Sequence, residues 1–400
     1  MHSESPTIDI IDTSAELGEP LPPWTYANWE LFELEYESLF LSRWQLVGHV
    51  NDVPNSGDYI AADIGRDSVV VLRGEDQELR AFLNVCRHRA SRIFEGKGSC
   101  RGVIRCPYHG WTYRFDGSLM AIPQEENFPD LDRSEYGLHE IQIEDFYGLV
   151  FVRVTGEGPT VAAQFAHTDT FFADYDVANY VEFAQPITDI WDVNWKVAWD
   201  NFLENYHIPM GHPGLNRLVQ ESGEWAELTS GVSYGVFRLR ERCSKVAEER
   251  RYQEQSHHGN RRLPEDLKDK WVQFGLTPNL GIDLYPEMLD LFQLIPLAPD
   301  KTMVRAAFYG HQDPTPEEEE LRRLNMQINT AINEEDKVLC ARVHQGLTTH
   351  GYEPGPLSQQ ESAVYNFHEM MRELIPVMAL RDEPVAGSVA TENARLLEQR

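Results

Sequence analysis

The sequence predicts an α+β protein, with a small all-β domain followed by a larger domain in which helices flank an antiparallel sheet. From about Gln45 to Val154 the chain alternates in short runs broken by Gly, Asn and Asp, which is typical of strands joined by tight turns. Beyond a Gly/Pro-containing boundary at 156–159, strand-like and helical stretches are mixed. A single helical pattern then covers residues 315–347. Sheet and helices segregated in this way define the α+β class.

The first half divides into an arm and the all-β domain. Residues 1–22 resemble a loose arm, and "YANWELFELEYESLFLSRW" has apolar residues at helical spacing. "SVVVLRGEDQELRAFLNV" predicts a hairpin that turns at Gly74–Asp76, and "GLVFVRV" predicts a further strand. We therefore expect an N-terminal arm and helix at 1–44, the all-β domain at 45–155 and a second domain at 156–400.

The second domain is expected to contain strands at "VSYGVFRLRER" and "MLDLFQLIPLAPDKTMVRAAFYG". The long helix should begin after Thr315, a suitable N-cap followed by acidic residues in the first turn. "EERRYQEQSHHGNRRLPEDLKDK" is charged and aperiodic, so a mobile surface loop is expected there, with His257 and His258 exposed to solvent.

Composition and charge limit the functional classes. With 42% hydrophobic and 11% aromatic residues, the chain can bury a large core. No apolar run approaches the roughly 20 residues of a membrane span, and the acidic N-terminus is unlike a signal or transit peptide. Five cysteines, an odd number, argue against a disulfide scaffold and indicate a reducing cytoplasm. A net charge of −30 disfavours nucleic acid and anionic membranes. It suits a cationic substrate or a basic electron donor, although an acidic surface that only aids solubility explains it equally well.

"NVCRHRASRIFEGKGSCRGVIRCPYHGW" concentrates three of the five cysteines and two of the fourteen histidines. It contains Cys-x-His, a seventeen-residue gap and Cys-x-x-His. A Cys₂His₂ zinc site is one interpretation, but zinc motifs usually pair cysteine with cysteine and histidine with histidine. A Rieske [2Fe–2S] centre uses two cysteines on one iron and two histidines on the other, which requires one of each from both loops. The expected ligands are Cys86, His88, Cys106 and His109, and Cys100 between them is expected to be an ordinary thiol.

A second group of candidate residues lies in "WDNFLENYHIPMGHP". On a helix, Asp200, Glu204 and His207 share one face, and a bend at Pro209 and Gly211 brings His212 around. Two histidines and a carboxylate form the facial triad of non-haem Fe(II) oxygenases. Taken alone, two histidines near a helix end are more often structural.

Together these motifs resemble the α subunits of Rieske non-haem iron ring-hydroxylating oxygenases and their demethylating relatives. The resemblance includes both Cys/His motifs, "NWK" at 194–196, the Glu204/His207/His212 cluster and "EEDKVLCARVHQGL" at 334–347. It implies a helix-grip, START-like catalytic domain, iron ligation by His207, His212 and Asp336 (with Glu335 as the fallback), and a homotrimer with or without a β subunit.

The resemblance also assigns Glu204 as the bridge between His109 of a neighbouring subunit and the iron site. Glutamate at this position is similar to the carnitine and betaine branch, whereas many ring dioxygenases carry aspartate. Asp200 is a candidate partner for an iron-binding imidazole, or a structural helix residue.

The implied activity is that of a terminal oxygenase. It hydroxylates or demethylates a small organic substrate with O₂, using electrons that reach it from NAD(P)H through a flavin/iron–sulfur reductase or ferredoxin. A Rieske electron-transfer protein and a non-catalytic ligand-binding protein are the alternatives, and neither needs the Glu204, His207, His212 and Asp336 set. A methylated amine and an aromatic compound remain equally open as substrates. "NLGIDLYPEMLDLFQLIPL" (279–297) alternates, which indicates either a pocket-lining face or, more often, core packing.

Overall fold

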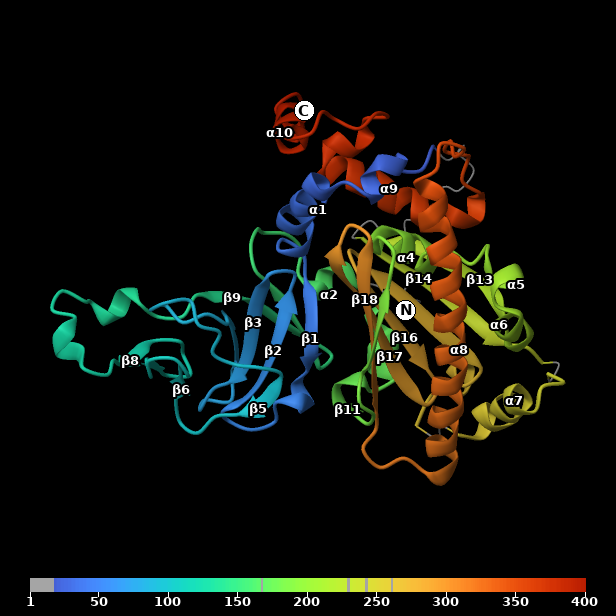
Figure 1. Cartoon of the computed structure of the whole chain (residues 1–400). Helices are drawn as coiled ribbons and strands as arrows, with labels where there is room; N and C mark the ends of the chain where they lie inside the picture. Colours follow the sequence, from blue (N-terminus) through green and yellow to red (C-terminus); the bar gives the residue numbers. More distant parts are fainter. Residues whose placement is uncertain (1–17, 167, 229–230, 242–243, 260–261) are drawn as a thin grey trace, which may run out of the picture. The chain divides into compact units, whose positions relative to one another are not determined.

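The computed structural model describes residues 18–166, 168–228, 231–241, 244–259 and 262–400. Contacts divide the chain into two compact units, Phe40–Ala162 with Ala178–Val181, and the remainder. Figure 1 shows the first unit as a sheet with loops at one end and the second as a sheet with helices. Most of the expected arm, residues 1–17, lies outside the described residues.

The first unit is all-β, as predicted. A seven-stranded sheet has the order β1-β10-β9-β4-β3-β2-β5, and a small sheet has the order β6-β7-β8. Its strands are β1 (Gln45–His49), β2 (Asp58–Ile64), β3 (Asp67–Arg73), β4 (Leu79–Leu83), β5 (Lys97–Ser99), β6 (Ile104–Arg105), β7 (Thr112–Tyr113), β8 (Leu119–Ala121), β9 (Glu140–Phe146) and β10 (Leu149–Arg153). The predicted hairpin turn is confirmed, since the Gly74 N–H donates to Glu78 O between β3 and β4.

The second unit is built on an antiparallel meander from β13 to β18. The sheet order is β11-β18-β17-β16-β15-β14-β13, with β12 also pairing with β18. Its strands are β11 (Val181–Glu182), β12 (Ile187–Trp191), β13 (Val219–Leu228), β14 (Val232–Leu239), β15 (Lys270–Leu276), β16 (Leu280–Tyr285), β17 (Met288–Ala298) and β18 (Lys301–Gly310).

Helix α8 packs along this sheet (Figure 1) and carries much of the core. Leu321 and Leu324 of α8 join Trp271, Tyr285 and Phe308 of the strands in one buried cluster. The longer helices of the chain are α1 (Trp29–Glu35), α3 (Asp169–Asp174), α4 (Trp195–Phe202), α6 (Pro213–Leu218), α7 (Ala247–Gly259), α8 (Pro316–Leu347), α9 (Ser362–Leu374) and α10 (Val389–Leu397). The expected start of α8 is confirmed, because Thr315 and Glu318 form a reciprocal capping box.

Two local expectations are corrected. The charged segment 248–270 was expected to be a loop, but its first part, as far as Gly259, belongs to the helix α7. The side chains of His257 and His258 lie outside the described residues. Tertiary contacts explain this helix: Tyr252 is fully buried and donates a hydrogen bond to Glu287. The predicted helix through Glu204 and His207 ends at Phe202. A continuous helix would place Pro209, which lacks an N–H, in its interior, whereas the break puts Pro209 in the first turn of the short helix α5 (Ile208–Gly211).

A buried ion pair fixes the start of α4. Lys196 Nζ bonds Glu35 Oε1, and the two side chains are 0% and 1% exposed. Trp195 Nε1 donates to the other Glu35 oxygen at 2.8 Å, and Asn194 caps α4 by accepting from the Lys196 N–H. The "NWK" segment is therefore an anchor that sets where the following turn, with its two histidines, begins.

Because removing one partner of a buried pair leaves an unpaired buried charge, we expect Glu35→Gln to destabilise this unit by about 3–5 kcal/mol. Urea unfolding followed by tryptophan fluorescence measures the effect as a lower denaturation midpoint. The control is Glu392→Gln, which breaks the exposed pair with Arg395 and should leave the midpoint unchanged. An unchanged midpoint for Glu35→Gln would show that the pair does not anchor α4.

Candidate iron centres and substrate pocket

Two loops of the all-β unit have the same backbone pattern around their cysteines. The Cys86 N–H donates to Ser91 O and Cys86 O accepts from Ala90 N–H. In the second loop, the Cys106 N–H donates to Trp111 O and Cys106 O accepts from Gly110 N–H. Ala90 and Gly110, both four residues after a cysteine, have positive φ angles of 54° and 75°. The two segments are thus repeats of one loop geometry, each presenting one Cys and one His.

The two loops bring the four expected cluster ligands together. The rings of His88 and His109 lie 4.7 Å apart between centroids. Cys86 and Cys106 are buried free thiols of one hydrophobic cluster. His88 Nδ1 is buried and has no hydrogen-bond partner among the described residues, as expected for a nitrogen that binds a metal ion. Cys100 lies apart, with its Sγ 3.4 Å from Gly57 O.

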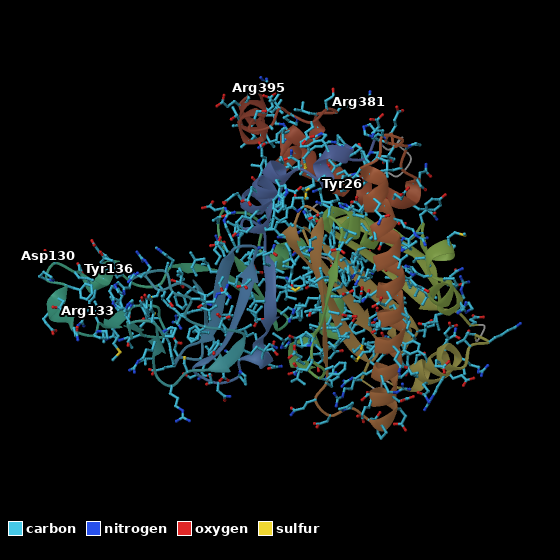
Figure 2. All side chains as sticks on the ribbon, viewed as in Figure 1. Tyr26, Asp130, Arg133, Tyr136, Arg381 and Arg395 are labelled. Carbon is cyan, nitrogen blue, oxygen red and sulfur yellow. The ribbon has the colours of Figure 1, made fainter. Side chains whose placement is uncertain are left out.

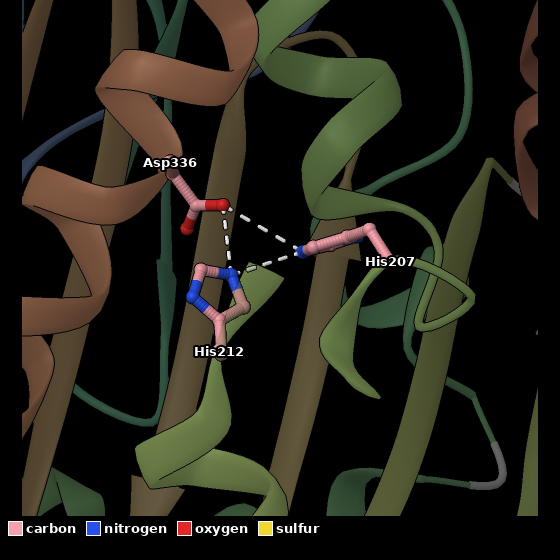
Figure 3. Close-up of side chains that lie close together, drawn as sticks. All are labelled: His207, His212 and Asp336. Carbon is pink, nitrogen blue, oxygen red and sulfur yellow. Dashed lines mark hydrogen bonds and ion pairs between the residues drawn. The ribbon is translucent and has the colours of Figure 1, made fainter. Parts of the chain in front are cut away.

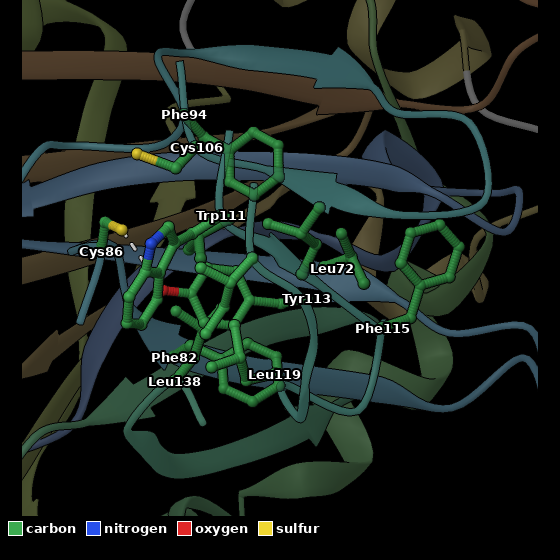
Figure 4. Packing of buried hydrophobic residues seen from close by; sticks show 13 residues of the cluster. Leu72, Phe82, Cys86, Phe94, Cys106, Trp111, Tyr113, Phe115, Leu119 and Leu138 are labelled. Carbon is green, nitrogen blue, oxygen red and sulfur yellow. Dashed lines mark hydrogen bonds between the residues drawn. The ribbon is translucent and has the colours of Figure 1, made fainter. Parts of the chain in front are cut away.

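The cysteines lie at the edge of a cluster of apolar side chains (Figure 4). Trp111 stacks on His88 with an interplanar angle of 4°, and Leu72, Phe82 and Leu119 belong to the same buried cluster. Tyr113 places its hydroxyl 3.3 Å from Cys86 Sγ and accepts a hydrogen bond from the Arg87 N–H. Burial raises the pKa of the Cys86 thiol, an effect that the Tyr113 hydrogen bond opposes. The site therefore combines low polarity with a hydrogen-bond donor to sulfur.

In the second unit, His207, His212 and Asp336 converge (Figure 3). The two Nε2 atoms are 3.1 Å apart, and Asp336 Oδ1 lies 2.9 Å from His212 Nε2 and 3.6 Å from His207 Nε2. Adjacent ligands of an octahedral ion with bonds of about 2.1 Å are separated by about 3.0 Å. The three atoms therefore match one face of an octahedron.

Two further carboxylates hold the imidazole rings. Glu204 Oε1 lies 2.6 Å from His207 Nδ1, and Glu335 Oε2 lies 2.8 Å from His212 Nδ1. When Nδ1 carries the proton, Nε2 presents its lone pair to a metal. Burial lowers the pKa of His212, but Asp336 and Glu335 outweigh that effect and raise it. This acidic surrounding favours a cation at the point where the three ligand atoms meet.

The turn between α4 and α6 makes this geometry possible. His207 precedes α5 and His212 joins α5 to α6. A Cβ at Gly211 would lie 2.8 Å from Leu339 Cδ1 of α8, so glycine allows the turn and α8 to pack closely without moving the Leu339 side chain.

Asp200 has different partners from those expected. It accepts a hydrogen bond from Tyr26 (Figure 2) at 2.9 Å and lies 3.0 Å from His368 Nε2. The carboxylates beside the iron-site imidazoles are Glu204 and Glu335 instead. Asp200 thus joins the N-terminal segment and α9 to α4.

A cavity opens beside the triad and is lined by β14–β17 and α8 as well as by the α4–α6 turn. Its walls include the aromatic residues Phe202, Phe237, Trp271, Tyr285 and Phe292. Segment 279–297 therefore does line the pocket through one face, while Leu280, Ile282 and Leu284 on the other face are buried core residues. Sequence reasoning missed Asp283, Asp290 and Asn329 as lining residues.

Comparison with known proteins agrees with this architecture. The sequence model of the ring hydroxylating alpha subunit (catalytic domain) matches residues 172–376, more than half of the chain, and that of the Rieske [2Fe-2S] domain matches residues 43–138. The chain belongs to the ring-hydroxylating α-subunit family. It is the terminal oxygenase of a Rieske oxygenase system, an enzyme that uses a [2Fe–2S] cluster, mononuclear iron and reductase-delivered electrons to oxygenate a small molecule. The electron-transfer and ligand-binding alternatives are not favoured.

Among curated relatives, the chain is 27% identical over 378 residues to a glycine betaine monooxygenase oxygenase subunit from Pseudomonas aeruginosa (strain UCBPP-PA14), covering 87% of each. It is 27% identical over 343 residues to the carnitine monooxygenase oxygenase subunit of Escherichia coli (strain K12), covering 84% of this chain and 87% of the relative.

Solved structures share the fold. A quaternary ammonium Rieske monooxygenase in complex with L-carnitine aligns with a TM-score of 0.74 at 22% identity, over 90% of this chain and 96% of the other. Naphthalene 1,2-dioxygenase from Rhodococcus sp. aligns with a TM-score of 0.70 at 21% identity, over 89% and 94% of the two chains. No described helix is long and apolar enough to cross a membrane.

We expect Tyr113→Phe to lower the reduction potential of the cluster by roughly 20–60 mV, because a hydrogen bond to sulfur stabilises the reduced state. Redox titration followed by EPR measures this shift. The matched control is Tyr136→Phe, whose ring contacts Trp111 at a centroid distance of 6.1 Å and which should leave the potential unchanged. Equal potentials for all three proteins would contradict the assignment of Tyr113.

Proposed function

We propose that His207, His212 and Asp336 bind Fe(II) and that Cys86, His88, Cys106 and His109 bind the [2Fe–2S] cluster. The observation that carries the iron assignment is the triangle of ligand atoms with edges of 3.1, 2.9 and 3.6 Å. The unpartnered buried Nδ1 of His88 and the paired loop geometry support the cluster assignment. Four described cysteines are free thiols, which suits the reducing cytoplasm that we propose as the location.

When bound, the cluster supplies single electrons and the Fe(II) supplies a centre for O₂ activation. The net monooxygenation is R–H + O₂ + 2 e⁻ + 2 H⁺ → R–OH + H₂O. The protein residues orient and shield the reactants. Glu204 and Glu335 hold the two imidazoles in one tautomer, and the aromatic walls exclude water from the substrate.

We further propose a homotrimer in which electrons cross between subunits. His109 is exposed, and the adjacent Tyr108 is 57% exposed. On the other unit, Tyr206 and Met210 beside His207 are 59% and 88% exposed. Large apolar side chains exposed next to both centres suit a protein interface. In this proposal Glu204 bonds the neighbouring subunit's His109 and, through Oε1, its own His207.

The proposed substrate carries a positively charged nitrogen. The carboxylates Glu204, Asp283, Asp290 and Asp336 line the pocket, and none of the described lining residues is Lys or Arg. An acidic cavity whose described lining has no basic side chain favours a cation. The relatives named for carnitine and glycine betaine also act on compounds of this kind, and as monooxygenases, so we propose monooxygenation rather than ring dihydroxylation.

Asp336→Asn should reduce the iron content from about three to about two atoms per chain while the two acid-labile sulfides remain. Metal and sulfide analysis, with EPR of the reduced cluster, tests the triad independently of activity. Glu334→Gln is the matched control, since Glu334 is exposed on the same helix and should leave all three irons in place. Three irons in Asp336→Asn, or zinc without sulfide in the parent, would refute the assignment.

Glu204→Gln should retain cluster and iron but slow the oxidation of the pre-reduced cluster by O₂ and substrate by about 10- to 100-fold. Rapid-mixing absorbance measures this rate in a single turnover. The comparison is Glu335→Gln, which alters the hydrogen bond of the other imidazole and should oxidise its cluster near the parental rate at saturating iron. Equal slowing in both variants would mean that Glu204 only orients His207.

A further inference from the structure

Two carboxylates face each other on neighbouring strands inside the substrate pocket. Asp283 of β16 and Asp290 of β17 are direct cross-strand partners, and Gln273 of β15 pairs with Asp283 on the other side. Directly opposed residues in an antiparallel sheet have Cβ atoms about 4.5–5.5 Å apart. All three residues line the cavity that also contains His207, His212 and Asp336.

Their surroundings leave the two carboxylates incompletely satisfied. Asp290 is only 4% exposed, and its Oδ2 accepts one long hydrogen bond, of 3.4 Å, from Asn329 Nδ2. The Oδ1 atoms of both Asp283 and Asp290 are buried and have no hydrogen-bond partner in the part of the chain that the structure describes. Buried carboxylate oxygens without donors are costly. A pair of them at a cavity wall therefore indicates that the missing donors come from a ligand.

The electrostatics agree with this interpretation. Burial, with the neighbouring Asp290 charge, raises the pKa of Asp283 well above its ordinary value, and burial raises that of Asp290 to about 7. Gln273 and Asn329 oppose these shifts only as neutral hydrogen-bond donors. Nothing described in the wall of the cavity supplies a positive charge. A cation between the two carboxyl groups removes both the unmet hydrogen bonds and the repulsion.

We propose that Asp283 and Asp290 are the specificity-determining pair of the pocket, and that they bind an organic cation with N–H donors, a protonated amine or a guanidinium group. A quaternary ammonium has no N–H to give to the two Oδ1 atoms. A zwitterion such as a betaine adds a carboxylate, and none of the described lining residues is a Lys or Arg that could pair with it. The inference rests on the proposed oxygenase function and separates this enzyme from its quaternary ammonium-oxidising relatives.

The position of the pair also indicates where oxidation occurs. Asn329, which contacts Asp290, precedes Asp336 by seven residues on α8, or about 10 Å along the helix axis. A nitrogen held at Asp283 and Asp290 is therefore remote from the triad, and the substrate body extends towards the triad through the cavity that both sites line. This arrangement favours hydroxylation of a carbon away from the nitrogen over N-demethylation.

Calorimetric titration of the iron-loaded protein with three matched ligands tests the pair. Phenethylammonium carries N–H donors and charge, its N,N,N-trimethyl analogue carries charge only, and 2-phenylethanol is neutral. We expect phenethylammonium to bind at least 10-fold more tightly than either analogue. Asp290→Asn and Asp283→Asn should each weaken it by about 10- to 100-fold and change the binding of 2-phenylethanol little. L-Carnitine and glycine betaine should bind more weakly than phenethylammonium.

The control variant is Asp300→Asn, which makes the same change of charge at the exposed turn between β17 and β18 and should bind as the parent does. Thermal melting of Asp283→Asn and Asp290→Asn, compared with the parent, checks that both variants fold. Tighter binding of the trimethyl compound, of a betaine or of 2-phenylethanol than of phenethylammonium overturns the proposal. The same holds if both Asp variants bind phenethylammonium as the parent does, or if the parent binds no cation that carries an N–H group. Iron and sulfide analysis of the same samples reports separately on the oxygenase function, because binding is measured without turnover.

Discussion

Two hydrogen bonds between imidazole Nδ1 atoms and carboxylates are the interactions on which the catalytic site depends. Glu204 lies 2.6 Å from Nδ1 of His207, and Glu335 lies 2.8 Å from that of His212. Without these two hydrogen bonds, each ring could rotate, or its proton could move to the Nε2 atom that faces Asp336. With them, two lone pairs and one carboxylate oxygen are held about 3 Å apart, which is favourable only when a cation lies between them.

These bonds require that the α4–α6 turn and α8 meet in one register. The Lys196–Glu35 pair fixes where α4 begins. Pro209 prevents α4 from continuing through His207 and His212, and Gly211 allows the turn to approach Leu339 of α8. Helix α8 contributes Asp336 and Glu335 to the site and Asn329 to the pocket. A helix is a rigid spacer, so the iron site and the opposite end of the pocket are held at a fixed separation.

Local patterns predicted much of this arrangement. Mixed Cys/His spacing indicated the loops around Cys86 and Cys106, and Thr315 marked the start of α8. The long-range partners were harder to predict. On α8, Glu335 and Asp336 are adjacent acids, and sequence alone does not say which faces both Nε2 atoms. For Asp200, the expectation of an iron-site partner rested on a helix that was extended too far, whereas its bonds to Tyr26 and His368 fit the alternative structural role. Helix α7 was missed because its stability comes from the burial of Tyr252.

The meeting of the two pocket acids follows from local sequence features. Asp283 and Asp290 stand in mainly apolar strands, and a charge in a core strand is unfavourable unless it has a partner or a function. Between them, Pro286–Glu287 forms a two-residue connection, since Tyr285 pairs with Met288. Such a hairpin sets its own register, which places residue 283 opposite residue 290. Alternation therefore explains which face is buried, and the turn explains why the two carboxylates meet. Because buried carboxylate oxygens without donors destabilise this strand pair, the proposed cation accounts for the presence of both acids.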